Sequence, residues 1–567
     1  MAKTGHAYPQ VEPCAADLMD RRVAKVAGSR SVGRALEAAR VAGAHVVTDL
    51  RAAARRDDLE RAAAWGLGRW RWLDAARTGL PSVTTGTGEV AVRRLQHGGA
   101  GLVLVREGRR VVGFVESSPP PAPSLAVRLE RIHGTEGEAR LWLLRTAGKL
   151  AEAQGQAVHA VGGFVRDLLL GRVLAQAAAR VPDLDLVVEG DGIAFGRRLA
   201  EETGGHLVVH SAFGTASLEG GMTPDGTRIG RVDIATARRE RYGMPGALPD
   251  VSPAGIDEDL GRRDFSVNAM AVALAPSAWG RLLDPFGGQR DLVARRLRVL
   301  HPLSFVEDPT RIFRGARYAA RFGLKPDAGF MRALALAWKI GEYPALSGQR
   351  LHAELELVMD EPDPWKVLGL LLGWGALKVW DPGYRVTSRS RGRLVAARSF
   401  AAWARGAGVA VDAGGLALVA LLFDQARPTA ERCLRRLAVA GVRAAELDTA
   451  GARSLARRVG AKALRRPSQV AETLRPARNA TLLGAWLCGG RRARSRIEWF
   501  LGQGRGARPL SSGDDVVAAG VPRGPRVAQV LGVLRDLRLD GRVRTKDDER
   551  AAVAEWTLAL TRKGESR

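Results

Sequence analysis

Two stretches decide the fold of the central region: Gly162-Gly163-Phe164-Val165-Arg166-Asp167 and Asp183-Leu184-Asp185-Leu186. The apolar residues 157–161 precede the first stretch and predict a strand, with a short helix after the turn. The glycine pair lets backbone N–H groups approach a phosphate group without a Cβ in the way. The first stretch therefore predicts a phosphate-binding turn between a strand and a helix.

The second stretch places two carboxylates on one face of a strand. Because strand side chains alternate, Asp183 and Asp185 are expected to share a face, while Leu184 and Leu186 turn into the core. Such a pair can hold two Mg²⁺ ions for in-line phosphoryl transfer, one at the attacking hydroxyl and one at the leaving pyrophosphate. Either stretch alone also fits a plain turn or a solvated strand end.

Four further motifs follow in order. They are Arg231-Val232-Asp233-Ile234, Arg262-Arg263-Asp264-Phe265-Ser266-Val267-Asn268-Ala269, Asp284-Pro285-Phe286-Gly287-Gly288 and Glu307-Asp308-Pro309-Thr310-Arg311. With the first two stretches they resemble the class II tRNA nucleotidyltransferase and poly(A) polymerase family over about residues 140–385. The resemblance implies a DNA polymerase β-like α/β head with a small mixed sheet, followed by an all-α neck, body and tail.

The resemblance also implies roles for individual residues. Asp183 and Asp185 would bind magnesium, and Asp233 is our candidate for a third catalytic carboxylate. The residues expected to bind the nucleotide in the head are Gly162, Gly163, Arg166, Arg263 and Asn268, with Arg263 at the incoming nucleotide and Asn268 near its ribose. For Arg262 the simpler interpretation is a solvated charge.

An enzyme that adds a fixed sequence without a template must recognise bases with its own side chains. Asp308 and Arg311 are three residues apart, hence neighbours on one helix face. A carboxylate accepts from the exocyclic amino group of cytosine or adenine, so Asp308 would favour these over uracil and guanine, with Arg311 donating to ring acceptors. Arg314 and Arg317 continue the stripe toward phosphate or acceptor-stem RNA. Asp308 before a proline also fits a helix cap, and both roles can coexist.

The composition is compatible with a nucleic-acid partner. Lys and Arg number 87 against 60 Asp and Glu, a formal net charge of +27, as expected of a protein that neutralises phosphates. Basic stretches concentrate late in the chain, at 432–436, 453–466 and 491–496. Genomic base composition could also produce this excess of arginine, but a tail that binds tRNA is the more economical interpretation.

Cysteine usage and hydropathy bound the cellular setting. Only Cys14, Cys433 and Cys488 occur, too scattered for a disulfide framework or a cysteine zinc site. The apolar run at 416–423 falls well short of the ~18 residues that a membrane span needs. We expect a soluble, cytoplasmic protein in a reducing compartment, with no membrane partner.

A proline-rich stretch at 117–123 predicts a stiff linker after an N-terminal domain. Residues 1–118 contain two similar strand and helix patterns that resemble a pair of CBS (cystathionine-β-synthase-type) motifs, which implies a possible adenine nucleotide ligand and homodimer. Asp57 or Asp58 could contact a ribose, although a solvated helix start is the simpler interpretation. The linker predicts few contacts across it, so the chain from Ser124 onward is expected to fold alone.

These patterns divide the chain into a CBS-like pair (1–118), a linker and connecting helix (119–139), a nucleotidyltransferase head (140–275), a helical neck (276–340) and a helical body and tail (341–567). Gln349 stands where the resemblance implies Glu, and its role stays open. No His-Asp pair with metal-ligand spacing occurs in the C-terminal half, so no phosphohydrolase domain is expected.

The resemblance implies a Mg²⁺-dependent transferase that adds CMP or AMP from CTP and ATP to tRNA 3′ ends and releases pyrophosphate. The motifs do not distinguish addition of CCA, of CC or of the terminal A. Two alternatives stay open, a poly(A) polymerase acting on mRNA and a non-catalytic RNA-binding regulator that senses nucleotides through the CBS-like pair.

Overall fold

The computed structural model describes residues 15, 19–49, 52–78, 80–87, 89–95, 102–116, 124–172, 184–211, 214–437 and 449–564. Asp183, Cys14 and the proline-rich stretch at 117–123 therefore lie outside the described residues. The chain divides into two compact units, residues 1–347 and 348–567.

The centre of the first unit is a seven-stranded mixed sheet with the order β10-β11-β12-β9-β8-β15-β16. Its strands are β8 (Ala157–Val161), β9 (Leu184–Glu189), β10 (His206–His210), β11 (Thr215–Glu219), β12 (Val232–Thr236), β15 (Ala271–Ala273) and β16 (Leu282–Leu283). Neighbouring strands pair antiparallel except β9 and β12, which are parallel. The predicted α/β head with a small mixed sheet is confirmed, and its sheet continues through β16.

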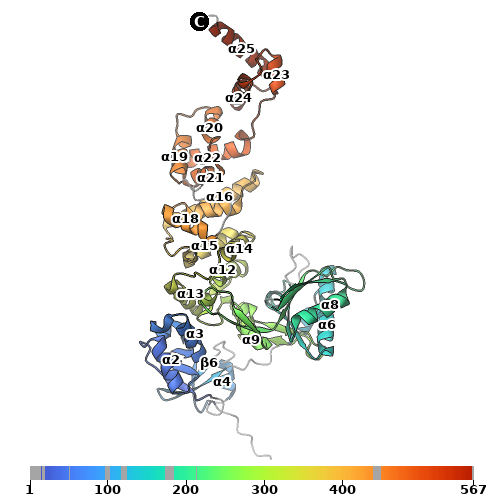
Figure 1. Cartoon of the computed structure of the whole chain (residues 1–567), viewed down its shortest axis with the longest axis vertical. Helices are drawn as coiled ribbons and strands as arrows, with labels where there is room; N and C mark the ends of the chain where they lie inside the picture. The colour runs from blue at the N-terminus through green and yellow to red at the C-terminus, as the bar shows by residue number, and fades with distance from the viewer. Residues whose placement is uncertain are drawn as a thin grey trace, which may run out of the picture. The chain divides into compact units, whose positions relative to one another are not determined.

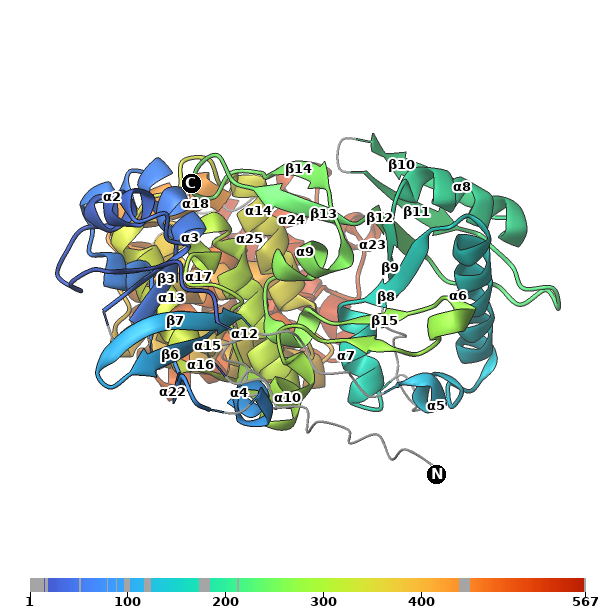
Figure 2. The same ribbon diagram turned by 90° about the horizontal axis from the view of Figure 1, so that it is seen from below.

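Helices α6 (Thr135–Ala153) and α8 (Gly192–Thr203) pack against this sheet (Figures 1 and 2). Strand β9 has its leucines in the core, since Leu184 and Leu186 are each 1% exposed, as predicted. Helix α7 (Gly163–Leu169) follows β8 directly and α9 (Ile256–Gly261) packs near Val161 and Val187. The strand, turn and short helix expected at 157–169 are thus present.

The predicted neck is only partly helical. It contains α10 (Gly288–Val293), α11 (Ser304–Glu307), α12 (Thr310–Phe322) and α13 (Ala328–Ile340), but also β16 and a parallel pair, β17 (Arg296–Leu297) and β18 (Lys325–Pro326). Continuous helix therefore begins later than position 276, because the chain first completes the head sheet.

The N-terminal part of the chain, from β1 to β7 (residues 23–116), repeats one arrangement of strands. In the first copy β1 (Val23–Lys25) is parallel to β2 (Val46–Thr48), which is antiparallel to β3 (Ala52–Arg55), with α2 (Val32–Val41) after β1. In the second copy β5 (Ser82–Thr84), α4 (Glu89–Leu95), β6 (Leu102–Glu107) and β7 (Arg110–Glu116) pair in the same way. An internal repeat is present, while the resemblance to CBS motifs stays a prediction.

The prediction of few contacts across the linker is wrong. After β3 comes α3 (Arg56–Ala64), which lies beside α13 in Figure 1. Leu303, Val306 and Leu336 share one buried apolar cluster with residues of the N-terminal part, including Leu59 of α3. Polar contacts add to this interface, for example from Arg77 Nη2 to the carbonyl of Leu300 at 3.1 Å. The N-terminal part is therefore packed on the neck rather than tethered by a linker alone.

The second unit is helical in all its described elements, as predicted for the body and tail at 341–567. Its helices are α14 (Gly348–Met359), α15 (Pro364–Trp374), α16 (Ser388–Gly406), α17 (Ala413–Leu422), α18 (Arg427–Leu437), α19 (Thr449–Gly460), α20 (Pro467–Leu474), α21 (Asn479–Cys488), α22 (Arg491–Trp499), α23 (Gly513–Ala518), α24 (Pro525–Leu539) and α25 (Lys546–Gly564). Gln349 is exposed on α14. No helix in the described part of the chain is both long and apolar enough to cross a membrane.

Some of the late arginines serve the fold of this unit. Arg496 on α22 donates to the carbonyls of Val459 at 2.6 Å and Ala461 at 2.8 Å, and also to that of Leu464. Val459 lies in the last turn of α19, where helices leave acceptors unsatisfied, and the other two carbonyls lie in the segment that follows the helix. A basic stretch that suggested RNA binding therefore includes a residue that caps a helix.

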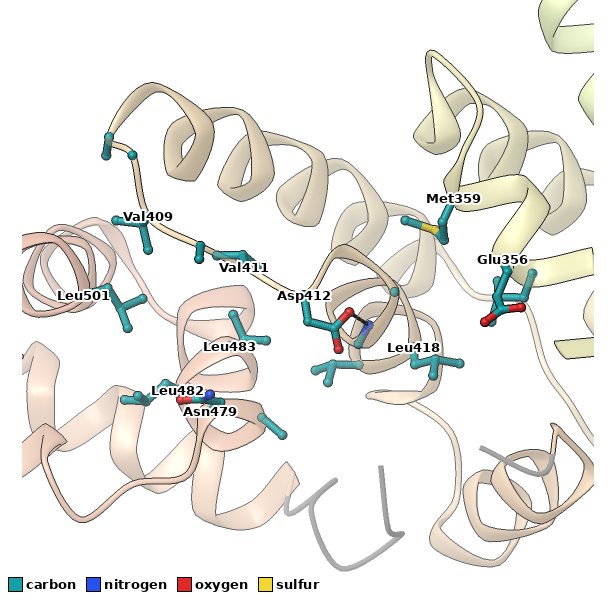
Figure 3. Close-up of a pocket in the computed structure, with 18 of the residues that line it drawn as sticks. Glu356, Met359, Val409, Val411, Asp412, Leu418, Asn479, Leu482, Leu483 and Leu501 are labelled. Atoms are coloured by element: carbon teal, nitrogen blue, oxygen red, sulfur yellow. Dashed lines mark hydrogen bonds between the residues drawn. The ribbon is translucent and has the colours of Figure 1, made fainter. Parts of the chain in front are cut away.

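The second unit also holds a pocket of about 1010 Å³. Figure 3 shows its lining residues on separate parts of the unit, with Val409 and Val411 between α16 and α17, Leu483 and Asn479 on α21, and Met359 and Glu356 on α14. Among the described residues, none that the sequence predicts for the nucleotide site lines this pocket.

Candidate active site

Asp185 and Asp233 lie opposite each other on the two parallel strands β9 and β12. Ile234 contacts the position of Gly196 on α8, so strand alternation turns Asp233 to the sheet face away from that helix. Register partners on neighbouring strands point to the same face, and Asp185 therefore faces the same side. The candidate third carboxylate is thus adjacent to one predicted metal ligand. Asp183 lies outside the described residues, so its pairing with Asp185 stays a prediction.

Asp233 is oriented by two donors. The hydroxyl of Ser217 donates to its Oδ1 at 2.6 Å, and Arg231 Nε donates to the same oxygen at 3.1 Å. The side chain of Asp233 is 45% exposed. It is therefore held in place on the sheet and still open to solvent and ligands.

The turn between β8 and α7 depends on Gly162. Its φ of 68° and ψ of −123° suit glycine alone. A Cβ at this position would lie 2.8 Å from Arg263 Nη1 and 3.8 Å from Asp185 Oδ2. Gly162, Arg263 and Asp185 are thus brought together, as predicted for a nucleotide site, and Gly163 begins the helix beside them.

A chain of hydrogen bonds links three predicted residues through a buried carboxylate. Arg166 Nη1 donates to Asn268 Oδ1 at 2.6 Å, and Asn268 Nδ2 donates to Asp264 Oδ1 at 3.0 Å. Arg314 Nε donates to Asp264 Oδ2 at 2.8 Å. Arg166 and Asn268 are each 5% exposed. These side chains therefore support one another beside the turn, and the contact of Arg166 and Asn268 with a nucleotide stays a prediction.

Arg262 and Arg263 share the fully buried carboxylate of Asp259. Arg262 Nη2 lies 2.6 Å from Asp259 Oδ1, and Arg263 Nη2 lies 3.0 Å from Oδ2. Burial opposes the charge of Asp259, but the two arginines outweigh it and keep its pKa below the usual value. The interpretation of Arg262 as a solvated charge is wrong, since its side chain is 18% exposed and also pairs with Glu240 at 2.8 Å.

The segment predicted to recognise bases follows on α11 and α12. Asp308 Oδ1 accepts from the backbone N–H and the hydroxyl of Thr310, the first residue of α12, at 3.0 and 2.7 Å. The N-cap of α12 is Pro309, so the predicted N-cap is displaced by one residue, and Asp308 binds the first N–H of the helix from the residue before it. Arg311 is 5% exposed and donates to the carbonyl of Arg262 at 2.9 Å and to Ser304 Oγ at 2.9 Å. Arg311 thus supports the segment that carries Arg263. Arg317 is half-buried on α12, and its role toward RNA stays a prediction.

The carboxylates of Asp185 and Asp233 suit a hard divalent cation, which prefers oxygen ligands. Within the described residues, from which Asp183 is missing, no cluster of three metal-ligating side chains occurs. A complete site would need a ligand beyond this pair.

Known proteins resemble this chain over the region that contains the candidate site. A family model described as the poly A polymerase head domain matches residues 158–298. A CC-adding tRNA nucleotidyltransferase of Deinococcus radiodurans is 35% identical over 393 residues, which are 69% of this chain and 87% of that protein. The chain belongs to the tRNA nucleotidyltransferase family. The resemblance inferred from the sequence motifs is confirmed, and members of this family generally use a divalent metal.

Two further similarities place the chain among the tRNA nucleotidyltransferases. An A-adding enzyme of Geobacter sulfurreducens is 34% identical over 422 residues, 72% of this chain and 46% of that protein. The solved structure of a Thermotoga maritima CCA-adding enzyme complexed with tRNA is 26% identical, with a TM-score of 0.63, over 77% of this chain and 100% of that chain. The chain spans half or less of three curated A-adding relatives, at 46%, 50% and 28% of their lengths.

Sequence reasoning missed the acids that hold the arginines of this candidate site: Asp259, Asp264 and Glu307. Their signal was present in part. Asp259 precedes Arg262 and Arg263 by three and four residues, and Glu307 precedes Arg311 by four, which are the spacings of helical ion pairs. Asp264 pairs with Arg314 across a long stretch of sequence, and local spacing carries no sign of that contact.

Proposed function

We propose that the protein is a Mg²⁺-dependent tRNA nucleotidyltransferase that adds CMP or AMP, as all or part of CCA, to tRNA 3′ ends. The observation that carries the proposal is the juxtaposition of Asp185 and Asp233 beside Gly162 and Arg263. Carboxylates for metal and a cationic, glycine-lined turn for phosphates are the two requirements of nucleotidyl transfer. CTP, ATP and tRNA as substrates are supported by solved structures of similar CCA-adding enzymes in complex with CTP, with ATP and with tRNA.

Each group in the site has a role in this reaction. Asp185, Asp233 and Asp183 would hold the metal, which when bound polarises the attacking tRNA hydroxyl and offsets charge on the leaving pyrophosphate. The turn at Gly162 and Gly163 would admit the triphosphate close to the backbone, and Arg263 would orient it. Asp308 would accept from the exocyclic amino group of cytosine or adenine.

The test uses purified protein and tRNA transcripts ending before CCA, after C and after CC, each with a single labelled nucleotide. Extension of all three supports CCA addition, whereas extension of the first two with CTP alone supports CC addition. Extension of the third alone, with ATP, supports A addition. Long A tails on unstructured RNA would instead identify a poly(A) polymerase, and no extension of any RNA would favour the non-catalytic regulator.

Asp308→Ala is expected to lower nucleotide selectivity more than activity. Removing the carboxylate leaves the amino group of C or A unpaired and removes the penalty against the carbonyl of UTP and GTP. Each such hydrogen bond discriminates by about 1–3 kcal/mol, so the ratio of kcat/KM for correct and incorrect nucleotides should fall roughly 5- to 150-fold. If Asp308 only stabilises the start of α12, the free energy of unfolding falls by about 1 kcal/mol and the melting temperature falls with it, while nucleotide selectivity stays unchanged.

Gly162→Ala and Gly163→Ala are expected to differ. Gly162→Ala forces a side chain into a glycine-only conformation against Arg263, at a cost of about 1–3 kcal/mol in stability. A Cβ at Gly163 meets only Arg166, whose Nη2 would lie 3.5 Å away, so this variant should fold normally. If the triphosphate approaches this backbone, Gly163→Ala should still raise the KM for nucleotide. An unchanged KM with unchanged stability would place the phosphates elsewhere.

A further inference from the structure

Arg61, on α3 of the N-terminal part, reaches the segment predicted to recognise bases. Its Nη1 donates to Glu307 Oε1 at 2.7 Å, and its Nη2 pairs with Asp58. Glu307 and Asp58 are 3% and 6% exposed, whereas Arg61 is 36% exposed. The interpretation of Asp58 as a solvated helix start is therefore wrong, because it holds Arg61 at this contact.

Glu307 connects Arg61 to the segment predicted to recognise bases. Its Oε2 lies 3.0 Å from His301 Nε2 and 3.5 Å from Arg311 Nη1, and it directly precedes Asp308 in the chain. Burial opposes the charge of Glu307, but its three basic neighbours outweigh burial and lower its pKa to about 2. The carboxylate is therefore charged at neutral pH and is shared between Arg61 and Arg311.

A second contact from the same helix region converges on Arg311. The indole N–H of Trp65 donates to the carbonyl of Tyr242 at 3.1 Å, and the hydroxyl of Tyr242 lies 3.3 Å from Arg311 Nη2. Both terminal nitrogens of Arg311 thus contact residues that the N-terminal part binds, since Nη1 contacts Glu307 and Nη2 contacts Tyr242. It also donates to the carbonyl of Arg262, next to Arg263 in the chain.

We propose that Arg61 is a positioning residue for nucleotide selection, acting through Glu307 on Arg311 and Asp308. The inference rests on the proposed function and adds a residue of the N-terminal part to those that select the nucleotide. Without Arg61 the buried carboxylate of Glu307 loses its shortest cationic contact in the cluster. It then depends on His301 and Arg311 alone, and a shift of Arg311 toward Glu307 weakens its hold on the carbonyl of Arg262.

The test compares full-length wild type with Arg61→Gln, Arg61→Lys and the control Arg40→Ala. Arg40 belongs to the same N-terminal part and pairs with Glu60 of α3 at 3.5 Å, but its side chain is 63% exposed and this ion pair includes neither Arg61 nor Glu307. The measurement is kcat/KM for CTP, ATP, UTP and GTP on tRNA. The ratio between correct and incorrect nucleotides does not depend on how much of the sample is folded, so a loss of stability alone leaves it unchanged.

Arg61→Gln is expected to lower this ratio at least about 5-fold, and Arg40→Ala to leave it unchanged. Arg61→Lys should give an intermediate ratio, since one ammonium group cannot span Glu307 and Asp58 as the two guanidinium nitrogens do. A ratio for Arg61→Gln equal to that of the wild type overturns the proposal, as does an equal loss in Arg40→Ala. Absence of transfer in the wild type would instead overturn the proposed function itself.

Discussion

Asp185→Ala is expected to reduce nucleotide transfer at least about 10³-fold while tRNA binding persists. Stabilisation of the transition state by a bound metal is normally worth several kcal/mol, and each 1.36 kcal/mol is a tenfold change in rate. Asp185 lies between the two other features of the site, the turn at Gly162 and the carboxylate of Asp233. The measurements are single-turnover transfer to a tRNA transcript and tRNA binding by filter retention.

Asp225→Ala is the matched control for this loss. Asp225 is an exposed aspartate in the turn between β11 and β12, where it accepts from the backbone N–H of Thr227 at 3.2 Å. It should keep transfer close to the wild-type rate. Asp183→Ala should fail as Asp185→Ala does if both acids bind metal. Near-normal turnover by Asp185→Ala would remove this residue from the metal site.

Local patterns in the sequence are enough to predict the parts of the site that depend on neighbours in the chain. Alternation along β9 places Leu184 and Leu186 in the core and Asp185 on the other face, and the glycine pair predicts the turn before α7. The position of Asp233 opposite Asp185 depends instead on strand register, which joins distant segments of the chain and leaves no local pattern in the sequence.

The buried partners of the arginines in the site escape prediction for a related reason. Arg166, Arg311 and Arg314 are basic residues suited to phosphate or base contacts. The structure gives each of them an internal partner, respectively Asn268, the carbonyl of Arg262, and Asp264. An arginine in a binding motif and an arginine in a buried ion pair look alike in sequence, since both need the same guanidinium group.

The composition of the proline-rich linker favours two independent domains. It does not predict the interface between the N-terminal part and the neck. Linker composition predicts stiffness and reach, not what the two flanking domains bury against each other. The apolar residues that meet there, such as Leu59 and Leu336, fit equally well into the core of either domain alone.

Deletion of residues 1–123 is therefore expected to destabilise the rest of the first unit severely. Leu303, Val306 and Leu336 would lose the apolar cluster that buries them, and Glu307 would lose Arg61. Exposing a buried aliphatic side chain costs about 1.5–3 kcal/mol, so the three together cost about 5–9 kcal/mol, which is comparable to the whole stability of a typical domain. The unfolding midpoint of the shortened chain should fall by more than about 10 °C, or the protein should aggregate.

Lys339→Ala in the full chain removes a polar contact of the same interface and keeps its apolar cluster, so it shows how much the polar contact contributes to stability. Lys339 pairs with Asp74 across it at 2.8 Å, but its side chain is 47% exposed, so its loss should cost at most about 1 kcal/mol. Differential scanning calorimetry of both proteins makes the comparison. A soluble chain from Ser124 onward with a wild-type midpoint and wild-type nucleotide selectivity would mean that the buried cluster contributes little. In that event the N-terminal part is an accessory domain, as the linker alone suggests.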